Sequence, residues 1–199
     1  MRRDKVKCVC LKTPEVKELY YRKRWMMDPE TMSYNAGYDM EMNGYDQMAG
    51  TIYKTDEQLR EWYEKWKKSP NRDFAYIYDT DLEIPVGEIY YQHYENEYEI
   101  GIVVASKHRG KGYGYPALIK LEKIAFEEKG ARALADWFPE ERIDAVRLFR
   151  KAGFLPTEIR RKELVFGQEK EAVKYLLTKE QYEQRKLESG DEENLYKDF

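Results

Sequence analysis

Residue types that often build functional sites are scarce in this 199-residue chain, which has two cysteines and two histidines. Cys8 and Cys10 lie two apart in a strand-like segment, so they point the same way and cannot easily form a disulfide. No further ligand is spaced for zinc. No apolar run approaches the roughly 18 residues of a membrane span, and no apolar block follows the basic N-terminus as in a signal peptide. We therefore expect a cytoplasmic protein without a metal or a membrane segment.

A strong charge of one sign is also missing. Lys and Arg number 35 against 38 Asp and Glu, a net charge of −3, and no long basic stripe occurs. Nucleic acid is therefore not favoured as a partner. The length suits a single α/β domain with a sizeable core. We expect this domain to span residues 1–180, followed by a polar, acidic and poorly packed tail over residues 181–199.

Hydrophobic periodicity predicts the order β-α-α-β-β-β-α-β-α-β-β, with an antiparallel meander in the middle. Thr13 and Pro14 predict the start of the first helix, and Thr55 with Gln58 predicts a capping box at the second. The strands are expected over residues 5–12, 74–78, 85–92, 98–105, 132–137, 154–166 and 172–177. The helices are expected over residues 13–27, 55–69, 115–129 and 142–151.

A basic, glycine-rich turn over residues 106–114 joins the third meander strand to the following helix. Strand, glycine turn and helix together direct backbone N–H groups and the positive end of a helix dipole at an anion. Glycines let the backbone approach the ligand, and Arg109 and Lys111 add positive charge. The turn therefore predicts a pyrophosphate site.

Three phosphate-binding patterns, and a surface turn without any ligand, compete for this segment. A nucleotide P-loop is excluded because no Gly-Lys pair precedes Ser or Thr. A dinucleotide fingerprint is weak because Tyr115 replaces its third glycine, although Asp136 stands where a ribose-binding acid is expected. The remaining pattern is [Q/R]-x-x-G-x-[G/A], met by Arg109, Gly112 and Gly114.

This last pattern resembles the acyl-CoA pyrophosphate loop of the GNAT superfamily of N-acyltransferases. The sequence LFRKAGF at 148–154 resembles the family's L-Y-x-x-x-G-F segment. The sequence IGIVV at 100–104 resembles the strand whose splayed end exposes backbone amides. The resemblance covers residues 5–177 and implies the GNAT fold. This is an α/β (α+β) fold with a mixed, mostly antiparallel sheet and about four helices.

The resemblance implies that an amine attacks the thioester of acetyl-CoA directly, without a metal. A backbone N–H near Val103 or Val104 would stabilise the oxyanion. Glu99 would act as the base, with Glu97 and His93 as alternatives; a solvated strand-end charge is the plain alternative for Glu99. The expected CoA contacts are Ile102, Val103, Val104, Arg109, Gly110, Lys111, Gly112, Tyr113, Gly114, Arg142 and Phe149.

Two positions depart from the family pattern. Phe149 stands where many members place a tyrosine that protonates the leaving thiolate, and Arg142 stands where a CoA-contacting Asn is common. Another tyrosine could substitute, and Tyr34, Tyr113 and Tyr115 are the candidates. A non-catalytic acyl-CoA-binding sensor or interaction module therefore remains an alternative function.

The acceptor is expected to bind between residues 28–54 and 154–171, by resemblance to the family. The first of these segments is rich in acidic residues and tyrosines, which suits a cationic amine, although a solvated acidic loop explains the composition equally well. Whether the acceptor is a small molecule or a protein N-terminus is left open, as is a homodimer.

Overall fold

We describe the protein from a computed structural model that places residues 7–94 and 97–188. The strands are β1 (Val9–Lys12), β2 (Arg72–Asp79), β3 (Ile84–Tyr94), β4 (Glu97–Val104), β5 (Ala133–Phe138), β6 (Leu155–Val165) and β7 (Gln168–Thr178). The helices are α1 (Leu19–Met26), α2 (Pro29–Met32), α3 (Asp56–Lys67), α4 (Gly114–Lys123), α5 (Ile143–Lys151) and α6 (Lys179–Glu188). Short 3-10 turns occur at Val16–Glu18, Ser33–Asn35 and Ser106–His108, and α4 continues as a π-helical segment, Ile124–Glu128.

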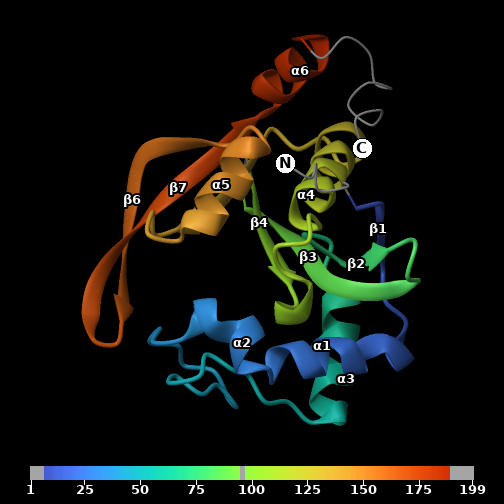
Figure 1. The fold of residues 1–199 in the computed structure, drawn as a ribbon, viewed down its shortest axis with the longest axis vertical. Coiled ribbons are helices and arrows are strands. Elements are labelled where there is room, and N and C mark those ends of the chain that lie inside the picture. The colour runs from blue at the N-terminus through green and yellow to red at the C-terminus, as the bar shows by residue number, and fades with distance from the viewer. Residues whose placement is uncertain (1–6, 95–96, 189–199) are drawn as a thin grey trace.

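The strands form one sheet in the order β1-β2-β3-β4-β5-β7-β6 (Figure 1). Neighbouring strands are antiparallel except β4 and β5, which are parallel. The predicted mixed sheet, its meander and its element order are confirmed, with α2 and α6 as additions. None of the described helices combines the length and the apolar character needed to cross a membrane.

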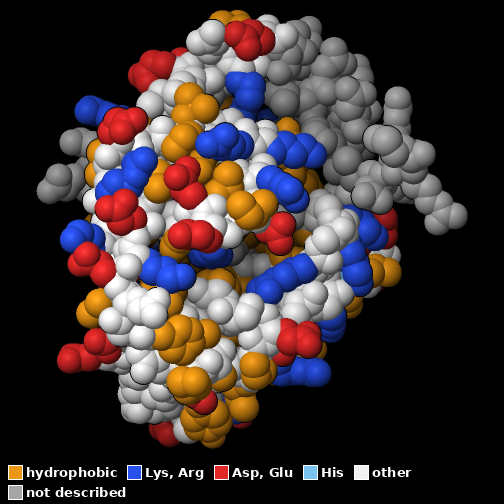
Figure 2. Space-filling view, turned by 60° about the vertical axis from the view of Figure 1, so that its left-hand side comes forward, with side chains coloured by type: hydrophobic (Ala, Val, Ile, Leu, Met, Phe, Trp, Pro, Cys, Tyr) orange, Lys and Arg blue, Asp and Glu red, His pale blue; other side chains and the backbone are white. Residues whose placement is uncertain are grey.

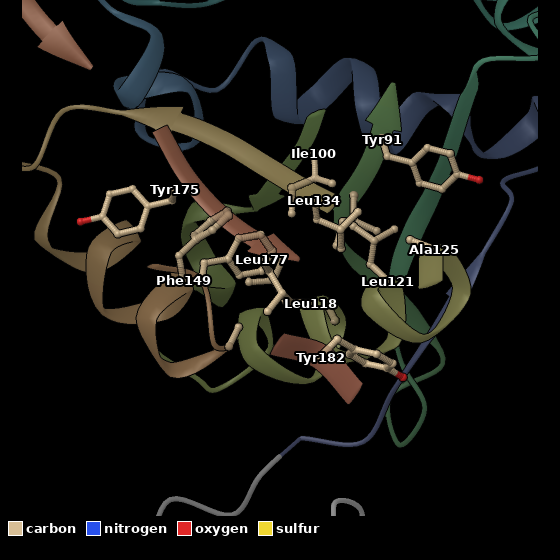
Figure 3. Packing of buried hydrophobic residues seen from close by; sticks show 14 of the residues in the cluster. Tyr91, Ile100, Leu118, Leu121, Ala125, Leu134, Phe149, Tyr175, Leu177 and Tyr182 are labelled. Atoms are coloured by element: carbon tan, nitrogen blue, oxygen red, sulfur yellow. The ribbon is translucent and has the colours of Figure 1, made fainter. Parts of the chain in front are cut away.

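Alternation along the strands sorts the buried side chains onto the two faces of the sheet. On one face, Phe74 and Tyr76 of β2 pack with Trp25 of α1. On the other face, Ile100 of β4 and Phe149 of α5 belong to the largest core cluster, to which α4 also contributes (Figure 3). Figure 1 shows α1 and α3 on one side of the sheet and α4 and α5 on the other. The sheet therefore has helices on both faces.

Local sequence signals set the ends of two helices. At the start of α3, Gln58 N donates to Thr55 Oγ1 at 3.2 Å and Thr55 N donates to Gln58 Oε1 at 2.9 Å, which is the expected capping box. Gly153 follows α5 with φ of +91°, a left-handed conformation that glycine adopts without strain and that ends the helix.

The first helix begins later than the sequence predicts. Thr13 and Pro14 were the expected start, but Glu15 and Glu18 form the capping box instead. Pro14 is buried, and its carbonyl accepts a hydrogen bond from the buried Tyr63 hydroxyl of α3. This tertiary contact holds the chain before the helix starts, and the local sequence carries no sign of it.

Part of the predicted C-terminal tail is also helical and packed. Tyr182 of α6 stacks on Phe126 with ring centroids 4.8 Å apart, and its hydroxyl donates to Glu127 at 2.6 Å. Arg185 forms an ion pair with the buried Glu122 of α4. The prediction of a poorly packed segment is therefore wrong for α6, while residues 189–199 lie outside the described part of the chain.

The β6–β7 hairpin extends away from the helices that cover the sheet and contacts the segment after α2. Phe166 N donates to Gly37 O at 2.7 Å, and Asp39 N donates to Leu164 O at 3.3 Å. The Phe166 ring lies against Gly37, where a Cβ atom would come within 2.4 Å of it. Glycine at position 37 thus allows the hairpin tip to close onto this segment.

Candidate functional site

The parallel pair of β4 and β5 is joined over a very short stretch. Tyr98 lies opposite Leu134 and Glu99 lies opposite Ala135, and no other pair joins these strands in the described chain. Both strands continue for several residues beyond this point. They therefore diverge, and a gap opens at the centre of the sheet, as expected from the resemblance of the sequence at 100–104.

The register of β4 decides which of its amides face the gap. Ala105 N donates to a carbonyl of β3 at 2.9 Å, whereas Val104 O accepts from Arg109 Nε at 3.0 Å on the other side. Backbone groups of alternate residues point to opposite edges of a strand. The amides of Ile102 and Val104 therefore face the gap, and the amide of Val103 faces β3. Of the two predicted oxyanion donors, this orientation favours Val104 over Val103.

A cavity of about 750 Å³ lies at this gap. It extends from the end of β4 past the glycine turn to α5, and its size suits a sizeable organic ligand. Figure 2 looks at the β6–β7 side of the molecule and shows a hollow near the middle of the surface, with Lys or Arg side chains beside it. The predicted CoA contacts that border the cavity are Ile102, Val103, Val104, Arg109, Gly110, Gly112, Tyr113, Gly114, Arg142 and Phe149.

The glycine turn has the backbone geometry expected of an anion site. Gly110 and Gly112 have φ of +70° and +87°, and a Cβ atom at either position would meet nothing within 4 Å. The amides of residues 110–113 donate to no protein acceptor among the described residues. They lie just before the N-terminus of α4, where the helix dipole also favours negative charge. A pyrophosphate fits this arrangement of free donors beside open space.

The charged side chains of the turn have hydrogen-bond partners within the protein. The Arg109 guanidinium donates to the carbonyl oxygens of Val104, Glu30 and Thr31, which joins the turn to β4 and α2. Lys111 Nζ donates to Lys107 O at 2.6 Å, and Lys111 does not border the cavity. Both side chains therefore shape the turn, and the expectation that they meet phosphate directly stays a prediction.

Asp28 connects the same turn to the helices of the opposite layer. Its carboxylate caps α2 by accepting from the amides of Glu30 at 3.3 Å and Thr31 at 3.1 Å, and it accepts from Ser106 Oγ at 2.8 Å. Partial burial works against its ionisation, but hydrogen bonds from Thr31 and Ser106 outweigh burial and keep the pKa of Asp28 below its ordinary value. The ionised carboxylate is therefore part of the fold.

We expect Asp28→Ala to lower the free energy of unfolding at pH 7 by about 2 kcal/mol, since a helix cap and a partly buried acceptor are lost together. Because the folded pKa is depressed, the contribution is present above pH 3.8 and is lost as the pH falls through the folded pKa. Urea denaturation at pH 7 and pH 3 measures this change. Asp81→Ala, at an exposed position in the β2–β3 turn, is the control, and a loss that does not shrink in acid would contradict the role of the carboxylate.

The three predicted candidates for the base do not border the cavity; they are Glu99, Glu97 and His93. Glu99 is partly buried on β4, opposite Gln92 of β3. Glu97 is engaged by Lys174 Nζ at 2.6 Å. The ring of His93 stacks on Tyr98 with centroids 4.5 Å apart. The structure leaves Glu99 nearest to the gap, because it is one of the last β4 residues paired with β5.

The candidates for a general acid differ in how their hydroxyls are used. The buried Tyr113 hydroxyl donates to Asp79, at the far end of β2. Tyr115 borders the cavity, with Lys151 Nζ 4.3 Å from its ring centroid. Tyr34 also borders the cavity, and burial raises its pKa to about 12. Phe149 is buried, with its ring 5.0 Å from Phe138, and has no proton to donate (Figure 3).

Asp136 of β5 is a cavity residue that sequence reasoning placed only in the weak dinucleotide pattern. Its Oδ1 accepts from Trp137 N at 2.7 Å. Burial raises the pKa of Asp136 to about 7, although this hydrogen bond and Arg142 work in the opposite direction. The signal in the sequence was an acidic residue inside the apolar run at 133–138. A carboxyl group that titrates near neutral pH inside a cavity is typical of functional sites.

No sequence pattern indicated the buried carboxyl group on β3. Glu88 of β3 lies opposite Val103 and is 6% exposed. Its Oε2 is 3.2 Å from Arg22 Nε of α1, and burial raises the pKa of Glu88 in spite of this partner. The Arg22 guanidinium in turn lies 4.2 Å from the Trp62 ring centroid. The ion pair joins α1 to β3, the neighbour of β4, and the Trp62 contact adds α3 to this arrangement.

Two of the five acidic residues in the predicted acceptor segment 28–54 have local structural roles. Asp46 Oδ1 accepts from the amides of Met48 and Ala49, and Asp28 caps α2. The Tyr34 ring, in contrast, borders the cavity, and the Arg142 guanidinium lies 5.2 Å from its centroid. None of the five acidic residues of this segment borders the cavity, so they do not give it a charged lining. In the described part of the chain, no group of three or more His, Cys, Asp or Glu side chains is placed to hold a metal ion.

Comparison with known proteins gives matches to one family and to its solved structures. The family model described as an acetyltransferase (GNAT) domain matches residues 10–155. A search of curated proteins found no match.

Two solved structures illustrate the similarity in fold. A spermidine N-acetyltransferase from Vibrio cholerae, in complex with CoA and spermine, is 16% identical with a TM-score of 0.72, covering 87% of this chain and 97% of that one. An acetyltransferase of the GNAT family from Bacillus anthracis is 20% identical with a TM-score of 0.68, covering 88% and 98%. At these identities the likeness shows the fold.

Proposed function

This chain belongs to the GNAT acetyltransferase family, and we propose that it transfers the acetyl group of acetyl-CoA to a primary amine of a small cationic molecule. One observation carries this proposal. A single cavity joins the glycine turn to the gap between β4 and β5, and Asp136 lies in that cavity. The cavity thus offers a site for an anion and a site for an acyl group, and one ligand can reach both.

Acetyl-CoA fits the chain's own groups at both ends of the cavity. The amides of residues 110–113 and the N-terminus of α4 supply donors for the pyrophosphate. The edge of β4 supplies the amides of Ile102 and Val104 for the amide-bearing arm of the ligand, which would pair with β4 as an added strand. Either amide can also donate to the oxyanion that forms when the thioester is attacked.

The proposal of a small cationic acceptor has two supports. The carboxyl groups of Glu99 and Asp136 lie at or beside the gap, and those of Glu141 and Asp144 border the cavity. In addition, the Vibrio cholerae structure was determined with spermine and is named a spermidine N-acetyltransferase. A polyamine is therefore the first acceptor to test, and a peptide N-terminus is the second.

A non-catalytic acyl-CoA binder is the second candidate, and Phe149 is the observation that favours it. The buried ring occupies the position where the family resemblance implies a proton donor. Under this alternative the cavity would bind acetyl-CoA, but no amine would accelerate the release of the thiol.

The test measures release of the CoA thiol from acetyl-CoA in the presence of polyamines, amino acids, aminoglycosides and peptides with free N-termini. Release that depends on a polyamine supports the proposal. Release that depends on peptides alone would show that the acceptor is a peptide N-terminus and not a small cationic molecule. Binding of acetyl-CoA without release on any amine would favour the non-catalytic binder, and absence of binding would contradict both candidates.

A further inference from the structure

Asp136 lies at the point where the two central strands diverge. It directly follows Ala135, the last β5 residue paired with β4. Side chains alternate along a strand, so Asp136 shares a face with Leu134 and Phe138, which belong to the core cluster under α4 and α5. It therefore approaches the cavity from the face that also carries Phe149.

The proposed reaction leaves a proton to be moved across this part of the cavity. When a neutral amine attacks the thioester, its nitrogen becomes positively charged and must lose a proton, and the departing sulfur must gain one. Phe149 has no proton to give, and the Tyr113 hydroxyl is hydrogen-bonded to Asp79. Glu97 is paired with Lys174 and does not border the cavity. None of these three groups is placed to supply the proton, and Tyr34 and Tyr115 are further hydroxyl-bearing residues that border the cavity.

We propose that Asp136 carries this proton, accepting it from the attacking amine nitrogen and delivering it to the CoA sulfur. This role rests on the acetyl transfer proposed above. The C–N bond forms as the amine electron pair attacks the carbonyl carbon, and the C–S bond breaks with its electron pair leaving on sulfur. The ammonium proton moves to the carboxylate and then to the thiolate, so the residue ends in its starting state. The products are an N-acetylamine and free CoA thiol.

The hydrogen bonds of Asp136 suit a carboxyl that exchanges a proton. Trp137 N donates to Oδ1 at 2.7 Å and fixes the orientation of the group. No described residue is hydrogen-bonded to the other oxygen. A proton acceptor and donor works best when its pKa lies close to the working pH, and burial brings the pKa of Asp136 to about 7.

Charged and titratable groups come toward Asp136 from several neighbouring elements, and Tyr175 of β7 lies directly opposite it. Arg142 at the start of α5 and Arg161 of β6 favour the carboxylate, whereas Glu99 of β4 favours the protonated acid. Tyr90 of β3 and Tyr34 face the same region, and burial raises the pKa of both hydroxyls, so they stay neutral near pH 7. Asp136, with its pKa of about 7, is thus placed to exchange a proton near neutral pH, whereas the two tyrosine hydroxyls are not.

The experiment compares Asp136→Asn with the wild-type chain, with Asp81→Asn as the control at an exposed position of the β2–β3 turn. The rate, its pH dependence and the Kd of acetyl-CoA are measured with the amine that gives release in the wild type. We expect Asp136→Asn to lower kcat about 100-fold or more, with the Kd of acetyl-CoA changed less than about 3-fold. The change of the rate with pH near pH 7 should also disappear.

A rescue variant separates protonation of the sulfur from other roles of Asp136. Adding Phe149→Tyr to Asp136→Asn places a hydroxyl on α5, and we expect it to restore kcat about 10-fold. Full activity of Asp136→Asn with an unchanged pH profile would overturn the proposed role while leaving acetyl transfer intact. An absence of rescue would overturn its second half, the delivery of the proton to sulfur. A wild-type chain that releases no thiol with any amine would overturn the proposed function itself, and this role with it.

Discussion

Replacing Gly112 with glutamate is expected to raise the Kd of acetyl-CoA at least about 100-fold, or about 2.7 kcal/mol. The residue has φ of +87°, which a side-chain-bearing residue adopts only with strain. The space beside it is open, so the new carboxylate would enter the volume assigned to the pyrophosphate. Both strain and charge repulsion therefore act on the same site, and isothermal titration of the folded variant measures their sum.

Gly130 offers a matched control for the strain alone. Its φ is +68°, it also has open space at the Cβ position, and it lies after the π-helical end of α4, away from the cavity. Gly130→Glu should lower stability by about 1–2 kcal/mol and leave the affinity for acetyl-CoA unchanged. Equal affinities of the Gly112 and Gly130 variants would show that the turn does not hold the pyrophosphate.

The second large effect concerns stability. Arg185→Ala is expected to lower the free energy of unfolding at pH 8 by about 3 kcal/mol, because it leaves the Glu122 carboxylate buried without its partner. The side chain of Glu122 is 0% exposed and that of Arg185 is 24% exposed, so solvent replaces this partner poorly. Chemical denaturation measures the loss. Lys186, on the same helix as Arg185, forms an ion pair with Glu127 that is more accessible to solvent than the Arg185–Glu122 pair. Lys186→Ala should therefore cost less than about 1 kcal/mol.

The pH dependence of this loss has a definite sign. Burial raises the pKa of Glu122 to about 7 even with Arg185 present. A carboxyl whose folded pKa is raised costs the protein stability as the pH rises from its ordinary value of 4.5 to the folded value. Removing Arg185 raises that value further, so the difference from wild type should grow above pH 7 and be smallest below pH 4.5. Glu122→Gln added to Arg185→Ala should recover part of the loss, and a loss independent of pH would contradict this account.

Elements that depend on local patterns could be predicted from the sequence. The capping box of Thr55 and Gln58, the glycine turn and the meander need only neighbouring residues to be recognised, and the structure has all three. The family was reached in the same way, from short segments in the right order. What these segments share is that their conformation is decided by residues within a few positions.

Features that depend on distant contacts could not be predicted. Helix α6 has a polar sequence, and its packing depends on Glu122 and Phe126, about sixty residues earlier. The direction of the Arg109 side chain is decided by carbonyls of α2. Likewise, the choice of Val104 over Val103 as the amide facing the gap follows from a hydrogen bond to β3. Each of these features depends on contacts between helices and strands that are distant in sequence, and hydrophobic periodicity does not indicate such contacts.

The short pairing of β4 with β5 divides the sheet into two parts, each continuous in sequence. Strands β1 to β4 precede α4, and strands β5 to β7 follow it, so the division of the sheet coincides with a division of the chain. Within the sheet, only two residue pairs of the described chain join the two parts. A ligand bonded to both edges of the gap would supply the missing ladder. Acetyl-CoA would then serve the protein as a structural strand during each turnover, and release of the product would leave the two halves less firmly coupled than before.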